Sequence, residues 1–481
     1  MANDVSNLAQ NETLKLAPAI ISIFGVTGDL STRKLLPALY ELEKNKLLHE
    51  KTRIVGITRR TLNIDDLLQK VRPSIRSIDG RIDEEALVRV TKKIIMYQMN
   101  SALPDDYPKY QMYMDNLEEK LGLCLNRLFY LAIPPQISMP IIRNLGKNGL
   151  NFGCTKHRNL AHLLLEKPFG FDLNSALELV ETTKKYFKET QLFRIDHYLA
   201  KETVQNIVTF RFQNPIFEDI WDNNHVESIE IVADEKLDIE GRANFYENVG
   251  ALRDLIQSHL LYVMAIILMP QPKDINSSKE MHKMRQLALD SIEPVPADCV
   301  NERAIRAQYE GYKAEVENKD SHTETFAALK LFSNDPVWRD VPIYLRSGKA
   351  LDSKKTSVSI NFKAKDDACK YTNQLTFHIQ PNESIVVQFW VKKPGFEKTM
   401  QLAPMEFSYK QTFDSHGHPD AYERVLVDAI RGDNMLFATS DEVLAAWRIL
   451  QFVVDAWGAS GDGLKYYAKG STGPNATTLY M

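Results

Sequence analysis

The apolar positions in the N-terminal part of the chain fall into short runs that alternate with amphipathic stretches. Residues 19–24 form a continuous apolar run of the kind that a buried parallel strand shows, and two glycines follow closely. The spacing of leucines then predicts a helix over 31–46, and a second strand is expected at 53–58. This order predicts a β-α-β unit near the start of the chain.

The same alternation continues and then changes. Further strands are predicted at 94–98, 127–133 and 160–166, with helical segments between them, which is typical of a parallel sheet covered on both faces. We therefore expect an α/β, Rossmann-like dinucleotide-binding domain over residues 1–196. Beyond it the strands are longer and more amphipathic, at 226–232, 357–362, 374–380 and 384–391, and they are mixed with long helices. Residues 197–481 are predicted to form a larger α+β domain with a mostly antiparallel sheet.

The length and net charge of the chain exclude several classes of protein. The chain has 481 residues, which is more than one core usually organises and so agrees with two domains. Its 59 Lys and Arg against 63 Asp and Glu give a net charge of −4, which lacks the basic surplus of a protein that coats nucleic acid. The longest apolar run, 260–269, is too short for a membrane span and predicts a buried helix.

Targeting signals and cysteines favour a reducing cytoplasm. The N-terminal segment carries acidic and amide residues, with no basic patch before an apolar stretch, so we expect no secretory signal. Cys124, Cys154, Cys299 and Cys369 form no CxxC pair, and neither a zinc knuckle nor a dithiol motif is expected.

The glycine turn at 25–31, with the sequence GVTGDLS, lies where the first strand gives way to the first helix. Backbone amides at a helix start can point at a pyrophosphate, and the missing side chains let the phosphates approach. The spacing departs from the common GxGxxG, and a plain tight turn would look the same. The turn is a candidate nucleotide site because of its position.

Thr58, Arg59 and Arg60 end the second predicted strand, where an enzyme that prefers NAD normally has an Asp or Glu for the ribose hydroxyl. A guanidinium can clasp a 2′-phosphate, so the sequence favours NADP over NAD. Two exposed arginines facing solvent are the alternative.

Two further segments carry candidate chemistry. Lys167 follows an apolar strand and precedes Pro168, so it should reach the same sheet edge as the glycine turn. If a helix begins near His197, then His197 and Lys201 share a face beside free amides, which would suit a phosphate. A solvent-facing lysine and an ordinary helix start are the respective alternatives.

His259 lies on a helical stripe with apolar neighbours. An imidazole in that setting is usually a satisfied core histidine, but a buried histidine held by a carboxylate is also the usual general base for removing a hydroxyl proton as hydride leaves. Spacing alone leaves both readings open and does not show which acid would pair with it. His416 and His418 lie in a polar loop without a third ligand, and no metal site is assigned.

Six segments in order resemble the glucose-6-phosphate 1-dehydrogenase family over nearly the whole chain. They are GVTGDLSTRKLLPALY at 25–40, EKPFG at 166–170, RIDHYLAKE at 194–202, GALRDLIQSH at 250–259, LRSGKAL at 345–351 and PDAYERVLVD at 419–428. The resemblance implies an NADP-dependent oxidoreductase that oxidises glucose 6-phosphate to 6-phosphoglucono-lactone, at the entry to the pentose phosphate pathway. It also implies a homodimer or homotetramer built on the second domain's sheet.

The resemblance assigns roles to residues at matching positions. His259 matches the general base and Asp196 the carboxylate that orients it. Substrate-binding positions are matched by Lys167, His197, Tyr198, Lys201, Glu235, Asp254 and Lys349, of which His197, Tyr198 and Lys201 bind the phosphate. Coenzyme-binding positions are matched by Gly25, Thr27, Gly28, Asp29, Leu30, Arg59 and Lys167.

Four positions depart from the family pattern without removing a catalytic group. Ser31 replaces an alanine, Ala200 a glycine, Ser258 an asparagine and Thr472 a tryptophan. Two other functions remain open from the residues. One is a different sugar oxidoreductase in which Lys167 is the base, and the other is a protein that senses NADP without chemistry.

Overall fold

The computed structural model describes residues 15–75, 81–154, 161–365, 371–413, 419–475 and 479. The chain forms two compact units. Unit 1 contains residues 1–170, 177–200 and 419–440, and unit 2 contains 171–176, 201–418 and 441–481. Most of the polar leader, Cys369 and the pair His416 and His418 lie outside the described residues.

Unit 1 is built on a seven-stranded sheet with the order β15-β6-β5-β4-β1-β2-β3. Its strands are β1 (Ala19–Phe24), β2 (Arg53–Thr58), β3 (Ile94–Gln98), β4 (Asn126–Leu131), β5 (His162–Leu165), β6 (Leu192–Ile195) and β15 (Phe437–Ala438). All pair in parallel except β15, which runs antiparallel to β6. The strands predicted from apolar runs are confirmed to within a few residues.

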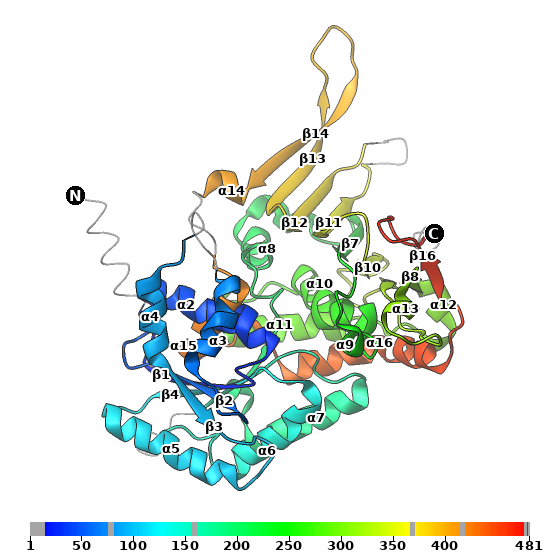
Figure 1. The fold of residues 1–481 in the computed structure, drawn as a ribbon. Coiled ribbons are helices and arrows are strands. Elements are labelled where there is room, and N and C mark those ends of the chain that lie inside the picture. The colour runs from blue at the N-terminus through cyan, green and yellow to red at the C-terminus, as the bar shows by residue number, and fades with distance from the viewer. Residues whose placement is uncertain are drawn as a thin grey trace, which may run out of the picture. The chain divides into compact units, whose positions relative to one another are not determined.

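Helices cover both faces of this sheet, as predicted. Figure 1 shows α2 (Leu36–Lys44), α3 (Ile64–Val71), α4 (Glu84–Lys93) and α15 (Ala421–Arg431) on one face, and α5 (Asp106–Leu121), α6 (Ser138–Lys147) and α7 (Leu173–Tyr186) on the other. The short π-helix η1 (Ser31–Leu35) leads into α2. β1 is buried at every position, and Ala19, Ile21 and Ile23 belong to a core that also takes residues from α2, α4 and α15.

Two features of unit 1 differ from the sequence expectation. Residues 419–440, which the sequence assigned to the second domain, pack in unit 1, where β15 adds a strand beside β6. The helix expected near His197 begins only at Glu202, because Asp196 accepts hydrogen bonds from the amides that follow it and holds them in a turn. The prediction that His197 and Lys201 share a helix face is therefore wrong.

Unit 2 is built on a nine-stranded, mostly antiparallel sheet with the order β14-β13-β12-β11-β7-β10-β9-β8-β16. Its strands are β7 (Val226–Asp234), β8 (Ala304–Tyr309), β9 (Phe326–Leu331), β10 (Ile343–Gly348), β11 (Lys355–Phe362), β12 (Gln374–Gln380), β13 (Ser384–Lys392), β14 (Met400–Ser408) and β16 (Lys465–Tyr467). Only the pairs β7–β10 and β8–β16 are parallel. The predicted combination of an α/β and an α+β domain is confirmed.

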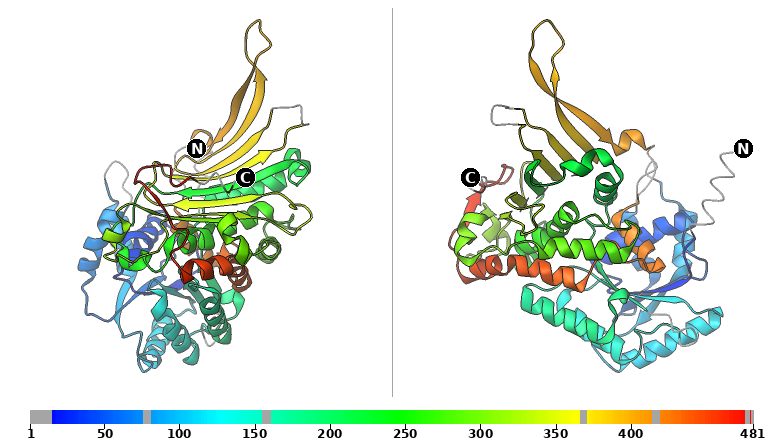
Figure 2. Two further views of the ribbon diagram at one scale, coloured as in Figure 1. Left: turned by 90° about the vertical axis from the view of Figure 1, so that its right-hand side faces the viewer. Right: turned by 180° about the vertical axis from the view of Figure 1, so that it is seen from behind.

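The helices of unit 2 include a long apolar one beside the sheet. They are α8 (Glu202–Gln213), η5 (Pro215–Ile220), α9 (Ala243–Tyr246), η6 (Leu252–Leu260), α10 (Leu261–Leu268), α11 (Ser278–Asp290), η7 (Ala297–Cys299), α12 (Val300–Arg303), α13 (Tyr312–Glu315), α14 (Tyr409–Thr412) and α16 (Ser440–Ala459). Segments η6 and α10 form one continuous helix, and every residue of α10 is buried, as the apolar run predicted. Figure 2 shows β13 and β14 extending as a hairpin past the ends of β11 and β12.

Two smaller observations complete the fold. Cys124 and Cys154, which are 30 residues apart, meet with their Cα atoms 5.4 Å apart and form a disulfide, a pairing that their spacing did not indicate. Within the described parts of the chain, no helix has both the length and the apolar character needed to cross a membrane.

Candidate functional site

The carboxyl ends of the unit 1 strands gather most of the residues that the sequence singled out there. Because β2, β1, β4, β5 and β6 are neighbours and all run in parallel, the residues that follow them lie along one sheet edge. These residues are Arg59 after β2, Gly25 after β1, Lys167 after β5 and Asp196 after β6. The prediction that Lys167 and the glycine turn reach the same edge is confirmed.

The glycine turn has the geometry that a phosphate cradle needs. Gly25 has a φ of 85°, and a Cβ added there would lie 2.4 Å from the carbonyl oxygen of Ala132. The amide of Gly28 donates to the carbonyl of Gly25 at 2.9 Å and closes the turn. Ser31 is buried and its hydroxyl donates to the same carbonyl at 2.9 Å, so the exchange of alanine for serine adds a bond inside the turn. This backbone could hold a pyrophosphate, because no side chain at Gly25 or Gly28 blocks its approach.

Arg59 is exposed at the end of β2, and the turn that follows keeps it at the sheet edge. Its carbonyl accepts a hydrogen bond from the side chain of Gln98, and the amide of Arg60 donates to the hydroxyl of Thr58. A guanidinium held beside a nucleotide cradle can bind a phosphate through two parallel hydrogen bonds.

Lys167 is preceded by a half-buried acid, Glu166, that sequence reasoning did not assign to the site. The hydroxyl of Tyr130 donates to Glu166, and burial raises the pKa of Glu166 to about 7. The charge of Lys167 opposes that rise. The bond between Lys167 and Pro168 is cis. The EKP sequence therefore places a cation beside a carboxyl group that is partly protonated near neutral pH.

Asp196 is almost fully buried at the end of β6. Burial raises its pKa to about 6, against the charge of His197 and a hydrogen bond of 2.7 Å from the amide of Tyr198. The strand that carries it is held by Arg194, which donates to Glu189 at 2.8 Å and to Ser440 at 2.7 Å. Arg194 is fully buried, so the first residue of the RIDHY segment has a structural role.

Unit 2 brings three predicted sugar-binding residues into direct contact. β7 and β10 are parallel neighbours in register, so Glu235 and Lys349 follow the last paired residues on adjacent strands. The ammonium of Lys349 forms an ion pair with Glu235 and lies 3.6 Å from Oδ2 of Asp254. Its side chain is only 4% exposed. Two acceptors and a donor thus converge at the carboxyl ends of two strands.

His259 lies on the same helix as Asp254, five residues further on. Residues 252–260 are wound as a π-helix, in which hydrogen bonds join residues five apart, and such segments often mark functional sites. His259 is completely buried. Ser258, which replaces the family's asparagine, donates its hydroxyl to the carbonyl of Asp254 within the helix.

Tyr246 is a contact that sequence reasoning missed. The ammonium of Lys349 lies 5.0 Å from the centre of its ring, within the range of a cation–π contact. Burial raises the pKa of its hydroxyl well above the usual range, and the charge of Asp254 adds to the rise. Tyr246 is the last residue of the short helix α9, which precedes η6 in the sequence, and only the fold shows that it faces Lys349.

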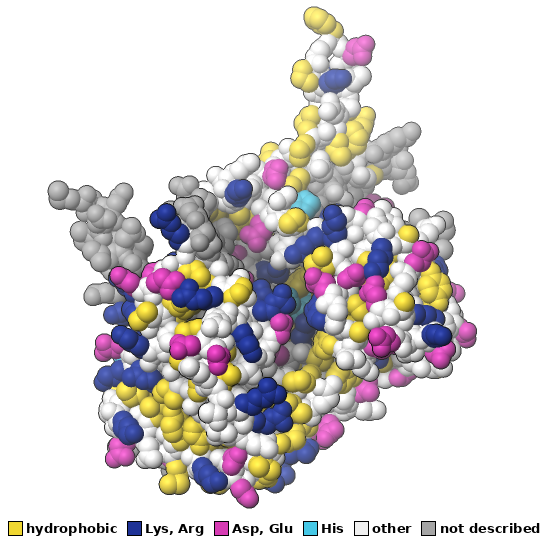
Figure 3. Space-filling view, in the orientation of Figure 1, with side chains coloured by type: hydrophobic (Ala, Val, Ile, Leu, Met, Phe, Trp, Pro, Cys, Tyr) yellow, Lys and Arg dark blue, Asp and Glu magenta, His cyan; other side chains and the backbone are white. Residues whose placement is uncertain are grey.

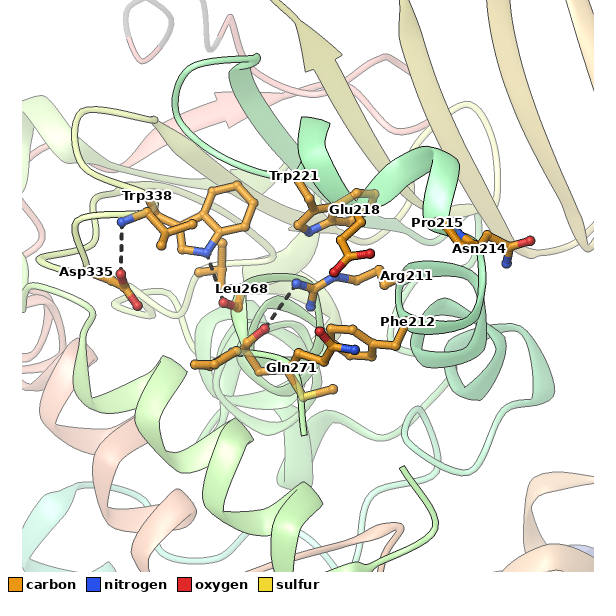
Figure 4. A pocket seen from close by; sticks show the side chains of 13 residues that line it. Arg211, Phe212, Asn214, Pro215, Glu218, Trp221, Leu268, Gln271, Asp335 and Trp338 are labelled. Atoms are coloured by element: carbon orange, nitrogen blue, oxygen red, sulfur yellow. Dashed lines mark hydrogen bonds between the residues drawn. The ribbon is translucent and has the colours of Figure 1, made fainter. Parts of the chain in front are cut away.

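A cavity of about 320 Å³ in unit 2 contains none of the predicted site residues. It lies at the C-terminal end of α10 and is lined by Arg211, Trp221 and Trp338 among others (Figure 4). These three side chains donate hydrogen bonds to the last carbonyls of the helix. Their polar groups therefore cap a helix end.

Two family models match the chain. The model described as glucose-6-phosphate dehydrogenase, NAD binding domain, matches residues 22–206, and the model described as glucose-6-phosphate dehydrogenase, C-terminal domain, matches 208–481. A glucose-6-phosphate 1-dehydrogenase from Chlamydia muridarum is 36% identical over 482 residues, covering 95% of this chain and 94% of the relative. One from Bacillus subtilis is 34% identical over 478 residues, covering 95% of each chain.

Solved structures agree with this match. A glucose-6-phosphate dehydrogenase in complex with its substrate glucose 6-phosphate superposes with a TM-score of 0.88 at 29% identity, covering 97% of this chain and 98% of the other. The glucose-6-phosphate 1-dehydrogenase from Mycobacterium avium gives a TM-score of 0.82 at 29% identity, covering 96% and 97%. The chain belongs to the glucose-6-phosphate dehydrogenase family of oxidoreductases.

Proposed function

We propose that this protein oxidises glucose 6-phosphate at its anomeric carbon to 6-phosphoglucono-lactone, with NADP⁺ as the coenzyme. This reaction is the first step of the pentose phosphate pathway. The observation that carries the proposal is the contact of Lys349 with Glu235 and Asp254 on unit 2, because it presents donors and acceptors to a polyhydroxylated ligand. The reaction itself is inferred from membership of the family.

The sugar is bound by unit 2 residues in this proposal. The carboxylates of Glu235 and Asp254 accept hydrogen bonds from sugar hydroxyls, and the ammonium of Lys349 donates to a sugar oxygen. The phosphate is bound by His197, Tyr198 and Lys201, which supply cationic and hydroxyl donors. Lys167 donates to both the substrate and the coenzyme.

His259 is the general base. It takes the proton of the anomeric hydroxyl while the hydride leaves the same carbon, so the carbon becomes the carbonyl of the lactone. Asp196 orients the imidazole and stabilises the imidazolium that forms. The nicotinamide coenzyme, when bound, accepts the hydride. The buried positions of His259 and Asp196 support these roles, because burial keeps water away from the proton transfer.

The coenzyme is NADP⁺ rather than NAD⁺. Gly25, Thr27, Gly28, Asp29 and Leu30 hold its pyrophosphate, and the cradle at Gly25, which a Cβ would fill, supports this. Arg59 binds the 2′-phosphate. Its exposure at the end of β2 supports the assignment, since its neighbours Thr58 and Arg60 carry no negative charge that would repel a phosphate.

The protein forms a homodimer or homotetramer through the sheet of unit 2. The edge strand β14 and its neighbour β13 expose apolar side chains along the extended hairpin (Figure 3), namely Phe389, Val391, Met400, Leu402 and Met405. An exposed apolar edge strand pairs readily with another chain. Sedimentation velocity would test this proposal. A cytoplasmic location stays a prediction, which cell fractionation would test.

The test of the function is an assay of the purified protein with glucose 6-phosphate and either NADP⁺ or NAD⁺, followed by reduced-nicotinamide absorbance. Turnover with NADP⁺, and less with NAD⁺, is expected. If NADP⁺ binds but absorbance does not change over a range of pH, the protein is a sensor of NADP instead. If only another sugar is oxidised, the substrate assignment is wrong.

A further inference from the structure

The helix that carries Asp254 and His259 begins at a tight contact with a distant segment. Gly250 has a φ of 67°, and a Cβ added to it would lie 2.3 Å from the side-chain oxygen of Glu324. Glu324 lies 74 positions further along the chain, just before β9. Only glycine leaves room for this carboxylate while also adopting the left-handed conformation.

Glu324 supplies hydrogen-bond acceptors to the start of this helix. Its backbone carbonyl accepts from the amide of Ala251 at 2.9 Å, and its carboxylate accepts from the amide of Leu252 at 3.0 Å. The first amides of a helix have no partner within the helix, and a carboxylate beside them also complements the helix dipole. Glu324 thus does from another segment what an N-cap side chain does locally.

The carboxylate of Glu324 is buried, and its surroundings act on its pKa in both directions. Glu324 is 4% exposed, and burial raises its pKa, while the charge of Arg253 and the amide of Leu252 oppose the rise. A residue with so little exposure to solvent cannot shift without moving the groups bound to it. The helix start is therefore fixed relative to this residue.

The next residue along the chain holds the other side of the sugar site. The carbonyl of Thr325 accepts from the amide of Lys349 at 2.9 Å, and the hydroxyl of Tyr467 donates to the carbonyl of Lys349 at 2.7 Å. The hydroxyl of Thr325 also bonds that of Tyr467 at 2.9 Å. Glu324 and Thr325 are consecutive, so one short segment anchors both the helix of Asp254 and the backbone of Lys349.

We propose that Glu324 is a positioning residue of the sugar-phosphate site. Through the amides of Ala251 and Leu252 it sets where Asp254 stands, and through its covalent neighbour Thr325 it sets where Lys349 stands, so it fixes the spacing of 3.6 Å between their charged groups. The inference rests on the proposed function, because it assigns the purpose of this spacing to sugar binding.

Three variants separate positioning from simple stability. In Glu324→Ala both the charge and the acceptor are lost, whereas Glu324→Gln keeps an acceptor for the amide of Leu252. Glu118→Ala is the matched control, because Glu118 in unit 1 is also a buried glutamate that accepts from a backbone amide, that of Leu125, and from an arginine. All three are expected to lower thermal stability.

The kinetic constants per folded enzyme carry the test. We expect Glu324→Ala to raise KM for glucose 6-phosphate about tenfold, as for a lost hydrogen bond to a charged group, while KM for NADP⁺ stays within about twofold. Glu324→Gln should recover most of the loss, and Glu118→Ala should leave both KM values unchanged. Unaltered KM for the sugar in Glu324→Ala, or an equal change in Glu118→Ala, would overturn the proposal.

Amide hydrogen exchange provides a second readout, which reports local opening of the helix start and requires no enzyme activity. Amides of residues 250–260 should exchange faster in Glu324→Ala than in the parent protein, and at the parent rate in Glu118→Ala. Equal exchange in all proteins would overturn the anchoring role. If the parent protein did not oxidise glucose 6-phosphate, the proposed function would fail, whereas this measurement would still confirm or refute the anchor.

Discussion

The two ends of the helix formed by η6 and α10 are held in opposite ways. At its start, a carboxylate and a carbonyl of Glu324 accept hydrogen bonds from backbone amides. At its end, Arg211 donates to the carbonyls of Ile266 and Met269 at 2.5 and 3.0 Å. An anion near the amide end and a cation near the carbonyl end both complement the helix dipole.

The difference lies in what else each end holds. The donors at the C-terminal end, which include the indoles of Trp221 and Trp338, bond to the carbonyls of Ile267 and Leu268. The N-terminal end carries Asp254, which faces Lys349. One helix thus has an end whose carbonyls are capped by buried side chains and an end whose Asp254 contacts Lys349, so substitutions at the two ends should change different quantities.

His259→Asn has the largest expected effect. Removing the general base should lower kcat by about a thousandfold, because proton transfer takes place in the transition state, while the affinity for glucose 6-phosphate changes little. Steady-state kinetics and calorimetric titration with the sugar phosphate measure the two quantities. A variant with nearly normal turnover would show that the base is another group, such as Lys167.

Arg211→Met should affect stability instead. It leaves two buried carbonyls without donors, which costs about 3 kcal/mol of the free energy of unfolding. The kinetic constants of the folded protein should not change. Urea unfolding and steady-state kinetics check both statements, with Trp338→Phe as a milder comparison that loses one donor. A large rise in KM for the sugar in Arg211→Met would remove the distinction between the two ends.

Arg59→Ala extends the comparison to unit 1. Losing a charged contact to the 2′-phosphate should lower kcat/KM with NADP⁺ about thirtyfold and with NAD⁺ less than about threefold. The KM for glucose 6-phosphate should stay the same, since Arg59 is not among the residues proposed to bind the sugar phosphate. Equal losses with both coenzymes would contradict the assignment of Arg59.

The raised pKa of Asp196 predicts a pH dependence. The carboxylate must be charged to stabilise an imidazolium, so kcat/KM should fall as pH drops below about 6 and be about tenfold lower near pH 5. The contribution of Asp196 to folding stability changes with pH in the opposite direction. The folded form binds the proton more tightly than the unfolded form, so this contribution to stability is present at low pH and is lost as pH rises from about 4 to about 6.

Asp196→Asn provides the check on both pH effects. Its activity should be low and should not fall further as pH drops below about 6. The decrease in unfolding free energy that Asp196 contributes between pH 4 and 6 should be absent from this variant. A parent profile that is flat down to pH 5 would contradict the role of Asp196.

Local patterns in the sequence predicted local features of the fold well. The apolar run of β1, the glycines after it and the arginine after β2 each depend on residues close together in the sequence. Periodicity and turn chemistry were therefore enough to identify them. The start of α8 was mispredicted because the side chain of Asp196 binds a backbone amide in competition with helix formation.

Features that depend on distant contacts left no mark in the sequence. The pairing of β15 with β6 joins residues more than 240 positions apart and rests on a strand of two residues. Tyr246 ends the short helix α9 and Glu324 lies in the loop before β9, and their partners Lys349 and Leu252 are known only from the fold. The family resemblance assigned catalytic roles to His259 and Asp196 but gave no role to the residues that contact the site from other elements, such as Tyr246 and Glu324.

The most direct test of the account is the affinity of glucose 6-phosphate for the parent protein and for Lys349→Gln, measured by calorimetric titration. Lys349 is the donor between Glu235 and Asp254 on unit 2. We predict binding to the parent protein, a loss of at least about tenfold in Lys349→Gln, and unchanged affinity for NADP⁺. Equal affinity of both proteins for the sugar phosphate would contradict the proposed site.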